Sequence, residues 1–431
     1  MPKRVVILGA GFAGIQAAVD LSKSLGARGQ AEITLVSDQN YFLFTPLLPQ
    51  IASSNIDPRH IAQPVRDLRG RRSFRFIRAS VRDLDLDGHE VHLKVHDDLD
   101  RGSGILPYDY LVISPGSRTD YFGIPGAREN TWDFKSLEDA VALRERVLDL
   151  CEHADHTSDD DIRRRLLTFV IVGGGYTGIE LVTELHDLLF SYVAQRYRGI
   201  RSEDIRLIVL EAGPAVLRGI HPKLAAHSSR RLARKGIEVR TNTPAARCFS
   251  GGVETKSGEV ISSDTIIWTA GVRAHEIVES LPCAHDRIGR AVVNEHLQLE
   301  GHLEVFVAGD SAAATEALDA PRVAPVAIDQ GRVAARNIAH TMRNEELESY
   351  RYVSKGMLVS LGMNYAVVNI GGLRFSGYFA WLFWNAVHLY KLVGLKKQLQ
   401  VAVDWILGEI FPRDAAIIRR PRRCPYCGTG Q

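Results

Sequence analysis

The sequence predicts an α/β protein in which two similar strand–turn–helix units are followed by a C-terminal region of different character. The first unit reads RVVILGAGFAGIQAAVDL (4–21), and a near copy, FVIVGGGYTGIELVTEL, spans 169–185. In each copy a continuous apolar run, typical of a buried parallel strand, gives way at a glycine turn to helical periodicity. From Glu345 short strands and glycines lead to an aromatic helix, so we expect an α+β region there.

The composition is that of an ordinary globular protein. The chain has 431 residues, enough for two or three domains, with 45% hydrophobic and 24% charged residues. A formal net charge of +2 gives no global field that would attract nucleic acid, so no nucleic-acid partner is expected. Five scattered cysteines are too few for a disulfide scaffold, which favours a reducing compartment.

Neither end of the chain suggests a membrane-spanning segment. The N-terminus runs directly into the first predicted strand, so we expect no signal peptide. The richest apolar run, GYFAWLFWNAVHLYKLVGL (377–395), is interrupted by Asn385, His388 and Lys391. It is therefore not predicted to be a transmembrane helix.

Other elements follow from the same patterns. Residues 151–165, where three aspartates precede three arginines, are predicted to be a solvated connection. The segment LEVFVAGDSAA (303–313) is predicted to be a strand that ends in Gly-Asp. The remaining predictions are strands at 4–8, 33–36 and 108–117, a helix from Phe12, a second strand–helix–strand unit at 168–211, a hairpin and buried strand at 251–271, and a helix at about 325–342.

Both turns carry the G-x-G-x-x-G spacing of a dinucleotide-binding Rossmann-like unit. In that motif the first glycine permits the tight turn, the second lets the backbone approach a pyrophosphate, and the third allows close packing of helix on strand. The phosphates then lie on the free N–H groups of the helix N-terminus. The glycines in question are Gly9, Gly11 and Gly14 in the first turn, and Gly173, Gly175 and Gly178 in the second.

An acid at the end of the following strand is expected to hold ribose hydroxyls. In the second unit this acid is Glu211, whose negative charge would repel a 2′-phosphate and so favour NADH over NADPH. In the first unit Ser37 occupies the expected position and Asp38 follows it. We predict a ribose contact for Asp38, the alternative being an ordinary turn residue.

Two dinucleotide units in one chain suggest one tightly held cofactor and one exchanging substrate. Asp310 follows a strand and precedes a helix, where a carboxylate can meet the ribityl hydroxyls of FAD; its alternative role is a helix cap. Glu180 lies two residues past the last glycine of the second turn. It is a candidate site acid beside the cofactors, the alternative being a first-turn acid that the helix dipole favours.

At this point the chain resembles the two-dinucleotide-binding-domain flavoproteins and, among them, most resembles the type II NADH dehydrogenases, the single-chain NADH:quinone oxidoreductases. The glycine turns and Gly-Asp are shared by many flavoproteins, whereas FLFTPLL, the Glu180 position and the aromatic C-terminal helix are more specific. The resemblance covers about 4–420 and rests on the stretches VVILGAGFAGIQAA, NYFLFTPLLPQIAS, YDYLVISPGS, IVGGGYTGIELVTEL, TIIWTAGV, VFVAGDSAA, APVAIDQGRVAARNI and FAWLFWNAVHLYKLVG.

The resemblance implies an FAD-binding domain at 1–115 and 296–342, an NADH-binding domain at 116–295 and a membrane-anchoring or dimerisation region at 343–431. It implies hydride transfer from NADH to the flavin and two-electron transfer to a quinone, with no metal and no proton pumping. The implied site residues are Glu180 and Gln330 as catalytic residues, Pro46, Gly116 and Ala327 with the first glycines, Asp38 and Asp310 for FAD, and Gly271 with the second glycines and Glu211 for NADH.

The chain departs from the family pattern on the quinone side. The family has Ala-Gln-x-Ala-x-Gln where this chain has Pro325 and Asp329 in place of the two glutamines, with Gln330 next. Gln330 could replace the second glutamine, but a shift of one residue rotates its side chain by about 100° around a helix. Pro49 also replaces a frequent tyrosine, so the electron acceptor is the less constrained part of the prediction.

The C-terminal region is expected to lie on a membrane. An apolar aromatic helix that ends in lysines suits the interface plane, and basic residues favour an anionic surface. This predicts a peripheral protein on the cytoplasmic face of the cell membrane, with a homodimer interface as a second use of the helix. The residues are Tyr378, Trp381, Leu382, Trp384, Leu389 and Leu392, then Lys391, Lys396 and Lys397, a second stretch at 400–411, and Arg419, Arg420, Arg422 and Arg423.

Three alternatives stay open. Cys424 and Cys427 form a C-x-x-C pair that is half of a zinc site, a redox dithiol or a tail without chemistry. The enzyme could be a sulfide:quinone oxidoreductase, although Cys151, Cys248 and Cys283 do not fall in the expected flavin segments. It could also be another NAD(P)H-dependent flavin reductase, and the lack of a C-x-x-C near either glycine turn argues against a disulfide reductase. From a different class, the chain could be a nucleotide-sensing flavoprotein that does not turn over.

Overall fold

The computed structural model describes residues 1–68, 74–95, 104–318 and 320–417, and these form two compact units. Each unit is assembled from separate stretches of the chain, so neither folds from one continuous segment. Unit 1 consists of 1–43, 62–118 and 272–354, and unit 2 of 44–61, 119–271 and the C-terminal residues from 355.

A ten-stranded sheet forms the centre of unit 1. Strand β1 pairs in parallel with β2 on one side and with β8 on the other, and β8 pairs in parallel with β21. The order is β22-β19-β20-β21-β8-β1-β2-β5-β6-β7. Their bounds are β1 Lys3–Leu8, β2 Ala31–Ser37, β5 Arg75–Asp85, β6 Glu90–Val95, β7 Gly104–Pro107, β8 Tyr110–Ile113, β19 Ala291–Val293, β20 Gln298–Leu299, β21 His302–Val307 and β22 Ala312–Ala314.

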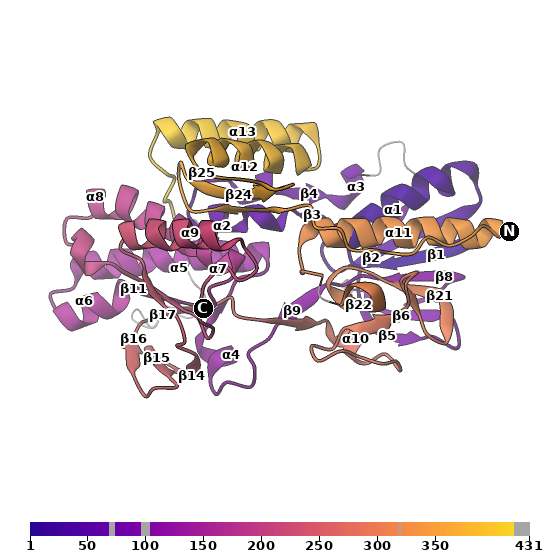
Figure 1. Ribbon diagram of the computed structural model, residues 1–431, viewed down its shortest axis with the longest axis horizontal. Coiled ribbons are helices and arrows are strands. Elements are labelled where there is room, and N and C mark those ends of the chain that lie inside the picture. Colours follow the sequence, from indigo (N-terminus) through magenta and orange to yellow (C-terminus); the bar gives the residue numbers. More distant parts are fainter. Residues whose placement is uncertain (69–73, 96–103, 319, 418–431) are drawn as a thin grey trace. The chain divides into compact units, whose positions relative to one another are not determined.

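Helices α1 (Phe12–Ser24) and α11 (Ala324–Arg343) run side by side over this sheet (Figure 1). Their backbones approach closely because Gly331 has no side chain: a Cβ there would overlap the carbonyl of Ala13. The first predicted strand–helix–strand unit and the helix predicted at 325–342 are confirmed.

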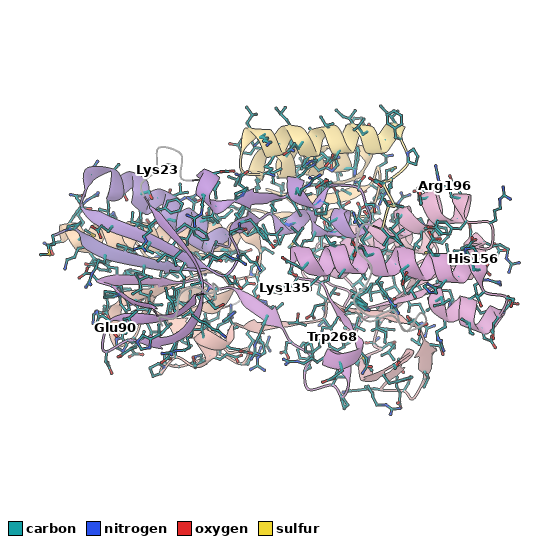
Figure 2. The ribbon with its side chains drawn as sticks, turned by 180° about the vertical axis from the view of Figure 1, so that it is seen from behind. Lys23, Glu90, Lys135, His156, Arg196 and Trp268 are labelled. Carbon is teal, nitrogen blue, oxygen red and sulfur yellow. The ribbon has the colours of Figure 1, made fainter. Side chains whose placement is uncertain are left out.

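A five-stranded parallel sheet forms the centre of unit 2, in the order β10-β17-β11-β12-β13. Trp268 of β17, labelled in Figure 2, is 2% exposed and packs in a core with Val170 and Ile208. The bounds are β10 Trp132–Asp133, β11 Thr168–Val172, β12 Arg206–Leu210, β13 Glu238–Arg240 and β17 Thr265–Trp268.

Helix α7 (Tyr176–Leu188) follows β11, and its acidic side chains accept hydrogen bonds from the C-terminal elements. The backbone N–H of Ser360, on β23, donates to Glu180 Oε1 over 2.9 Å, and that of Met363 donates to Asp187 Oδ2 over 2.6 Å. The elements concerned are β23 Met357–Ser360, β24 Ala366–Ile370 and β25 Leu373–Gly377, which form an antiparallel sheet, then α12 Tyr378–Lys391 and α13 Leu395–Ile410, adjacent in Figure 1.

The other elements are short or peripheral, apart from α5, which packs with α2 near α7. Their bounds are η1 Gly26–Arg28, β3 Tyr41–Leu43, η2 Thr45–Leu47, α2 Leu48–Ala52, η3 Pro58–His60, β4 Ala62–Pro64, α3 Val65–Leu68, β9 Ser117–Thr119, α4 Ala127–Asn130, α5 Leu137–His156, α6 Asp160–Leu166, η4 Leu189–Val193, α8 Ala194–Arg196, η5 Ser202–Asp204, α9 Pro222–Arg234, β14 Ala245–Phe249, β15 Gly252–Thr255, β16 Val260–Ser262, β18 Val272–Ala274, α10 Glu276–Glu279, η6 Gly309–Ser311 and η7 Thr315–Ala317.

The predicted solvated connection at 151–165 is wrong. Helix α5 continues to His156 and buries Cys151 completely, and α6 begins at Asp160. The side chain of Asp159 accepts from the N–H groups of Asp161 and Ile162, which caps α6. Aspartates in the first turn and arginines in the last complement the helix dipole, so the charge runs favour a helix.

The units also divide the chain differently from the predicted domain boundaries. Residues 272–295 belong to unit 1, because β19 pairs with β20 and β22 in the large sheet. Residues 44–61 and 355–417 belong to unit 2, because α2 and β23 pack against α7. Which ligand each unit holds stays a prediction.

In the described ranges of the chain, no helix is both long enough and apolar enough to cross a membrane. The pair Cys424 and Cys427 and the four predicted tail arginines lie outside the described residues.

Candidate functional site

The first glycine turn has the geometry that a bound pyrophosphate requires. Gly9 has a φ of +94°, in the left-handed region that favours glycine, and a Cβ at Gly14 would overlap the carbonyl oxygen of Gly9. Nothing lies within 4 Å of the place where a Cβ of Gly11 would stand. The N-terminus of α1 has neither a side-chain cap nor an acid in its first turn, which suits this helix end to an anion.

The Gly-Asp segment lies in the same unit and is held in place from two sides. The hydroxyl of Ser117 donates to Asp310 Oδ2 over 2.5 Å. The backbone N–H of Gly309 donates to Gln330 Oε1 over 2.7 Å, and the Cβ of Ala327 is close to Gly309. These contacts orient a carboxylate on η6, where it can bind hydroxyl groups.

Two further predicted FAD residues belong to unit 1. Gly116 has a φ of +83°, and its carbonyl accepts from the hydroxyl of Ser311, which ties the end of the β8 loop to η6. Asp38 is exposed directly after β2, with Ser37 Oγ 3.5 Å from its Oδ1. The open helix N-terminus, the oriented Asp310 and the acid after β2 fit the pyrophosphate, ribityl and ribose parts of FAD.

Two further predicted site residues, Gln330 and Pro46, lie in different units. Gln330 is 3% exposed and its amide oxygen is used by Gly309, so its contact is with the Gly-Asp turn. Pro46, on η2, belongs to unit 2, whereas the other predicted FAD residues belong to unit 1. Its flavin contact stays a prediction.

The second glycine turn, in unit 2, repeats the geometry of the first. Gly173 has a φ of +114°, and a Cβ at Gly178 would overlap the carbonyl oxygen of Gly173. The space beside Gly175, which precedes α7, is open. Gly271 lies after β17, and a side chain there would collide with the ring of Phe122. This turn therefore suits a second pyrophosphate.

Glu211, one residue past β12, is 7% exposed and accepts three hydrogen bonds. The donors are the backbone N–H groups of Gly174 (2.9 Å) and Gly213 (2.7 Å) and the Arg218 guanidinium (2.6 Å). Burial alone would raise the pKa of this carboxyl, but the donors outweigh it and lower the pKa below its usual value. Glu211 is therefore an anion directly beside the second turn.

Glu180 is the fifth residue of α7, just past its first turn, and is partly buried. Burial, together with the nearby charge of Glu184, raises its pKa to about 8, although the N–H of Ser360 acts in the opposite direction. The Trp384 indole N–H also lies near the carboxyl and, like the Ser360 N–H, acts to lower the pKa. A carboxyl with this pKa holds its proton at neutral pH, and the Glu180 residue is partly exposed.

Two more acids on α7, Glu184 and Asp187, are buried and were not singled out from the sequence. Burial raises the pKa of Glu184, although its ion pair with Arg413 (3.3 Å) opposes this. For Asp187 the hydrogen bond from His186 and the charge of Lys235 overcome burial and lower the pKa to about 2. The sequence did contain a signal for these two acids: with Glu180 they have i, i+4, i+7 spacing, which places all three on one side of a helix.

The described cysteines are free thiols with little nucleophilic character. Cys151 is fully buried and burial raises its pKa; burial likewise raises the pKa of Cys248 to about 11 and that of Cys283. A thiolate is the reactive form of cysteine, so these residues are poor candidates for attack on sulfide.

Comparison with known proteins identifies the class. Residues 3–331 match the family described as pyridine nucleotide-disulphide oxidoreductase, and residues 354–414 match the NDH2 C-terminal domain. The chain thus has the two-dinucleotide fold of the flavin- and nicotinamide-dependent oxidoreductases.

The relatives narrow this class further. Type II NADH:quinone oxidoreductase NdhA of Mycobacterium tuberculosis is 33% identical over 416 residues, covering 93% of this chain and 86% of that protein. NDH2 of Plasmodium falciparum, solved with NADH, has a TM-score of 0.86 at 18% identity and covers 96% of this chain and 100% of that one. A sulfide:quinone oxidoreductase of Aquifex aeolicus shares the fold, with a TM-score of 0.73 at 20% identity and 96% coverage of both chains. The chain belongs to the type II NADH:quinone oxidoreductase family.

Two glycines of the second turn, the open Gly175 and the tightly packed Gly178, give a matched test. Gly175 has a φ of −72°, which alanine adopts freely, and open space beside it. We expect Gly175→Ala to keep the melting temperature of the parent but to raise the KM for NADH about tenfold, a loss of about 1.4 kcal/mol, because the methyl group keeps the pyrophosphate from the backbone.

Gly178→Ala is the contrasting variant. Its methyl group must displace the Gly173 carbonyl, so this variant should lose both stability and NADH affinity, with a cost of about 1–3 kcal/mol. Circular dichroism melting and steady-state kinetics measure the two effects. An unchanged KM in a folded Gly175→Ala protein would show that no phosphate approaches this turn.

Proposed function

We infer that the chain is an NADH:quinone oxidoreductase that uses FAD and does not pump protons. The observation that carries this conclusion is the pair of open glycine turns, one in each unit, with the protonated carboxyl of Glu180 on the helix that follows the second turn. One turn serves a resident cofactor and the other an exchanging nucleotide.

Unit 1 is proposed to hold FAD. The N-terminus of α1 would bind the pyrophosphate, Asp38 the ribose and Asp310 the ribityl chain, with Ser117 and Gln330 positioning the Asp310 turn. Bound FAD supplies the redox chemistry, since it accepts a hydride from NADH and passes two electrons to the quinone. The protein groups assigned here bind FAD and orient it.

Unit 2 is proposed to hold NADH at the N-terminus of α7. Glu211 accepts from the turn itself through Gly174, so its carboxylate is held where ribose hydroxyls are expected. Its negative charge disfavours a 2′-phosphate, which supports NADH as the preferred donor. Gly271 keeps the loop after β17 free of a side chain beside this turn.

Glu180 is proposed as the acid that supplies a proton during quinone reduction. A quinone takes up two electrons and two protons, and hydride transfer brings only one of these protons. A partly exposed carboxyl with a pKa of about 8 holds a proton at neutral pH and releases it readily. Glu184 adds negative charge behind it, and the Ser360 N–H fixes one of its oxygens.

We propose that helices α12 and α13 dock on the cytoplasmic surface of the cell membrane. On α13 the apolar residues at i, i+4, i+8, i+11 and i+15 are all exposed, which makes one apolar face. The opposite face of α13 contacts the segment 44–61 of the same unit: His60 Nδ1 lies 2.5 Å from Asp404 Oδ2, and the Trp405 indole donates to Gln50 over 2.7 Å. The exposed residues are Tyr378, Phe379, Leu382, Phe383 and Tyr390 on α12, and Leu395, Leu399, Val403, Ile406, Leu407 and Ile410 on α13.

Of the residues expected on this surface, Trp384 and Leu392 are instead buried, at 2% and 4% exposure. Trp384 stacks on His388 with ring centroids 3.9 Å apart, so it belongs to the packing between α12 and its own unit. A homodimer formed through the same apolar face is the competing arrangement.

The Glu180 role predicts a specific pH dependence. The kcat for reduction of a short-chain quinone should fall as pH rises through about 8, because Glu180 then loses its proton. In Glu180→Gln this fall should disappear and kcat should drop by about 10²-fold. The measurement is steady-state turnover from pH 6 to about 9.5 at saturating NADH. Glu129→Gln, at an exposed position on α4, is the control; a Glu180→Gln protein that keeps the parental fall assigns the titration to another group.

The membrane role predicts that a single charge on the α13 face weakens vesicle binding. Ile406→Asp should reduce co-sedimentation with anionic vesicles severalfold, because burial of a carboxylate among acyl chains is costly. The matched control is Leu303→Asp, since Leu303 on β21 is also 60% exposed. If both variants pellet as the parent does, the membrane surface lies elsewhere; a loss of dimer in sedimentation velocity would assign the face to a second copy.

A further inference from the structure

Arg218 lies against the buried Glu211 while most of its own side chain faces solvent. Its Nη2 is 2.6 Å from Glu211 Oε1, and the arginine side chain is 64% exposed, against 9% for the glutamate. A guanidinium has five N–H donors, so this contact leaves donors directed to solvent beside the acid expected to bind ribose.

The loop that carries Arg218 is built onto the second glycine turn. The N–H of Leu217 donates to the Gly174 carbonyl over 2.8 Å, and the Tyr176 hydroxyl donates to the Arg218 carbonyl over 3.3 Å. Leu217 has a φ of +52°, which costs a non-glycine residue about 1–2 kcal/mol. A strained residue bonded to the turn fixes the arginine relative to the nucleotide position.

Gly213 makes room for the guanidinium. A Cβ at Gly213 would lie 2.5 Å from Cζ of Arg218, so any other residue here would push the guanidinium away from its present position. The N–H of the same residue donates to Glu211 Oε1, the oxygen that Arg218 also binds. The acid, the glycine and the arginine therefore form one arrangement at the end of β12.

Glu211 and Arg218 have opposite effects on a 2′-phosphate. Glu211 is an anion at neutral pH and repels a phosphate on the ribose 2′-oxygen. A guanidinium is the side chain best matched to phosphate, through paired charge-assisted hydrogen bonds. As long as Glu211 is present it both repels the phosphate and engages one edge of the arginine.

We propose that Arg218 is a 2′-phosphate-binding residue of this nucleotide site, masked by Glu211, so that the pair selects NADH over NADPH. The proposal rests on the inference that the second turn binds the dinucleotide. It implies that removal of the Glu211 charge does more than abolish repulsion: it frees a guanidinium whose backbone the loop contacts hold near the second glycine turn. Any use of NADPH by the parent protein should also depend on Arg218.

The test measures binding of two fragments that differ only in the 2′-phosphate, adenosine 2′,5′-bisphosphate and 5′-AMP. Titration calorimetry on the full FAD-bound chain would compare the parent, Glu211→Ala, Arg218→Ala and the double variant. We expect Glu211→Ala to tighten binding of the bisphosphate at least tenfold, with little change for 5′-AMP. The double variant should lose this gain, and added salt should weaken it.

Arg230→Ala, at an exposed position on α9, is the matched control and should bind both fragments as the parent does. If Glu211→Ala is unstable, Glu211→Gln replaces it, because it removes the charge while its one amide oxygen still accepts from one of the two backbone N–H groups, that of Gly174 or that of Gly213. A double variant that keeps the tightened binding overturns the role of Arg218. If the parent binds neither fragment nor NADH, the nucleotide site itself is misassigned, which is a separate failure.

Discussion

Three acids on one side of α7, two of them buried, bond distant segments of unit 2 to this helix, and the candidate site depends on them. Each carboxyl meets a donor from a segment far away in the chain: Ser360 N–H for Glu180, Ser53 and Arg413 for Glu184, and Lys235 for Asp187. Loss of one partner from a buried ion pair typically costs about 3–5 kcal/mol, because the other charge stays buried without compensation. The same helix begins at the second glycine turn, so α7 positions both the proposed nucleotide site and the C-terminal elements.

This arrangement explains why one helix carries acids in different states. Asp187 is surrounded by His186 and Lys235, so its charge is compensated and its pKa is low. Glu180 has a backbone N–H and no cation among its named neighbours, and Glu184 behind it adds negative charge. Two carboxyl groups on one helix therefore differ because their surroundings differ: Asp187 is an ionised partner in an ion pair, whereas Glu180 holds a proton.

The fold was predictable because its signals are local. The two glycine spacings and the continuous apolar strands identified both dinucleotide units, and Asp310 and Glu211 lie where strand ends were expected. The partners of Glu184 were not predictable, since they lie far away in the chain. The ion pair of Glu211 with Arg218 was not predictable either, because it depends on the conformation of the loop between them. Helix α6 was missed for another reason: its charge runs were interpreted as solvation, whereas their order along the chain favours a capped helix.

Electron transfer through the two nucleotide sites is the central claim, and the visible absorption spectrum of the purified FAD-bound protein tests it most directly. Under anaerobic conditions NADH should bleach the flavin band at once, and a short-chain quinone such as menadione should restore it, over repeated cycles. Bleaching without recovery by any short-chain quinone would contradict the assigned electron acceptor. A flavin band that NADH leaves unchanged would contradict hydride transfer itself and favour a protein that only senses the nucleotide.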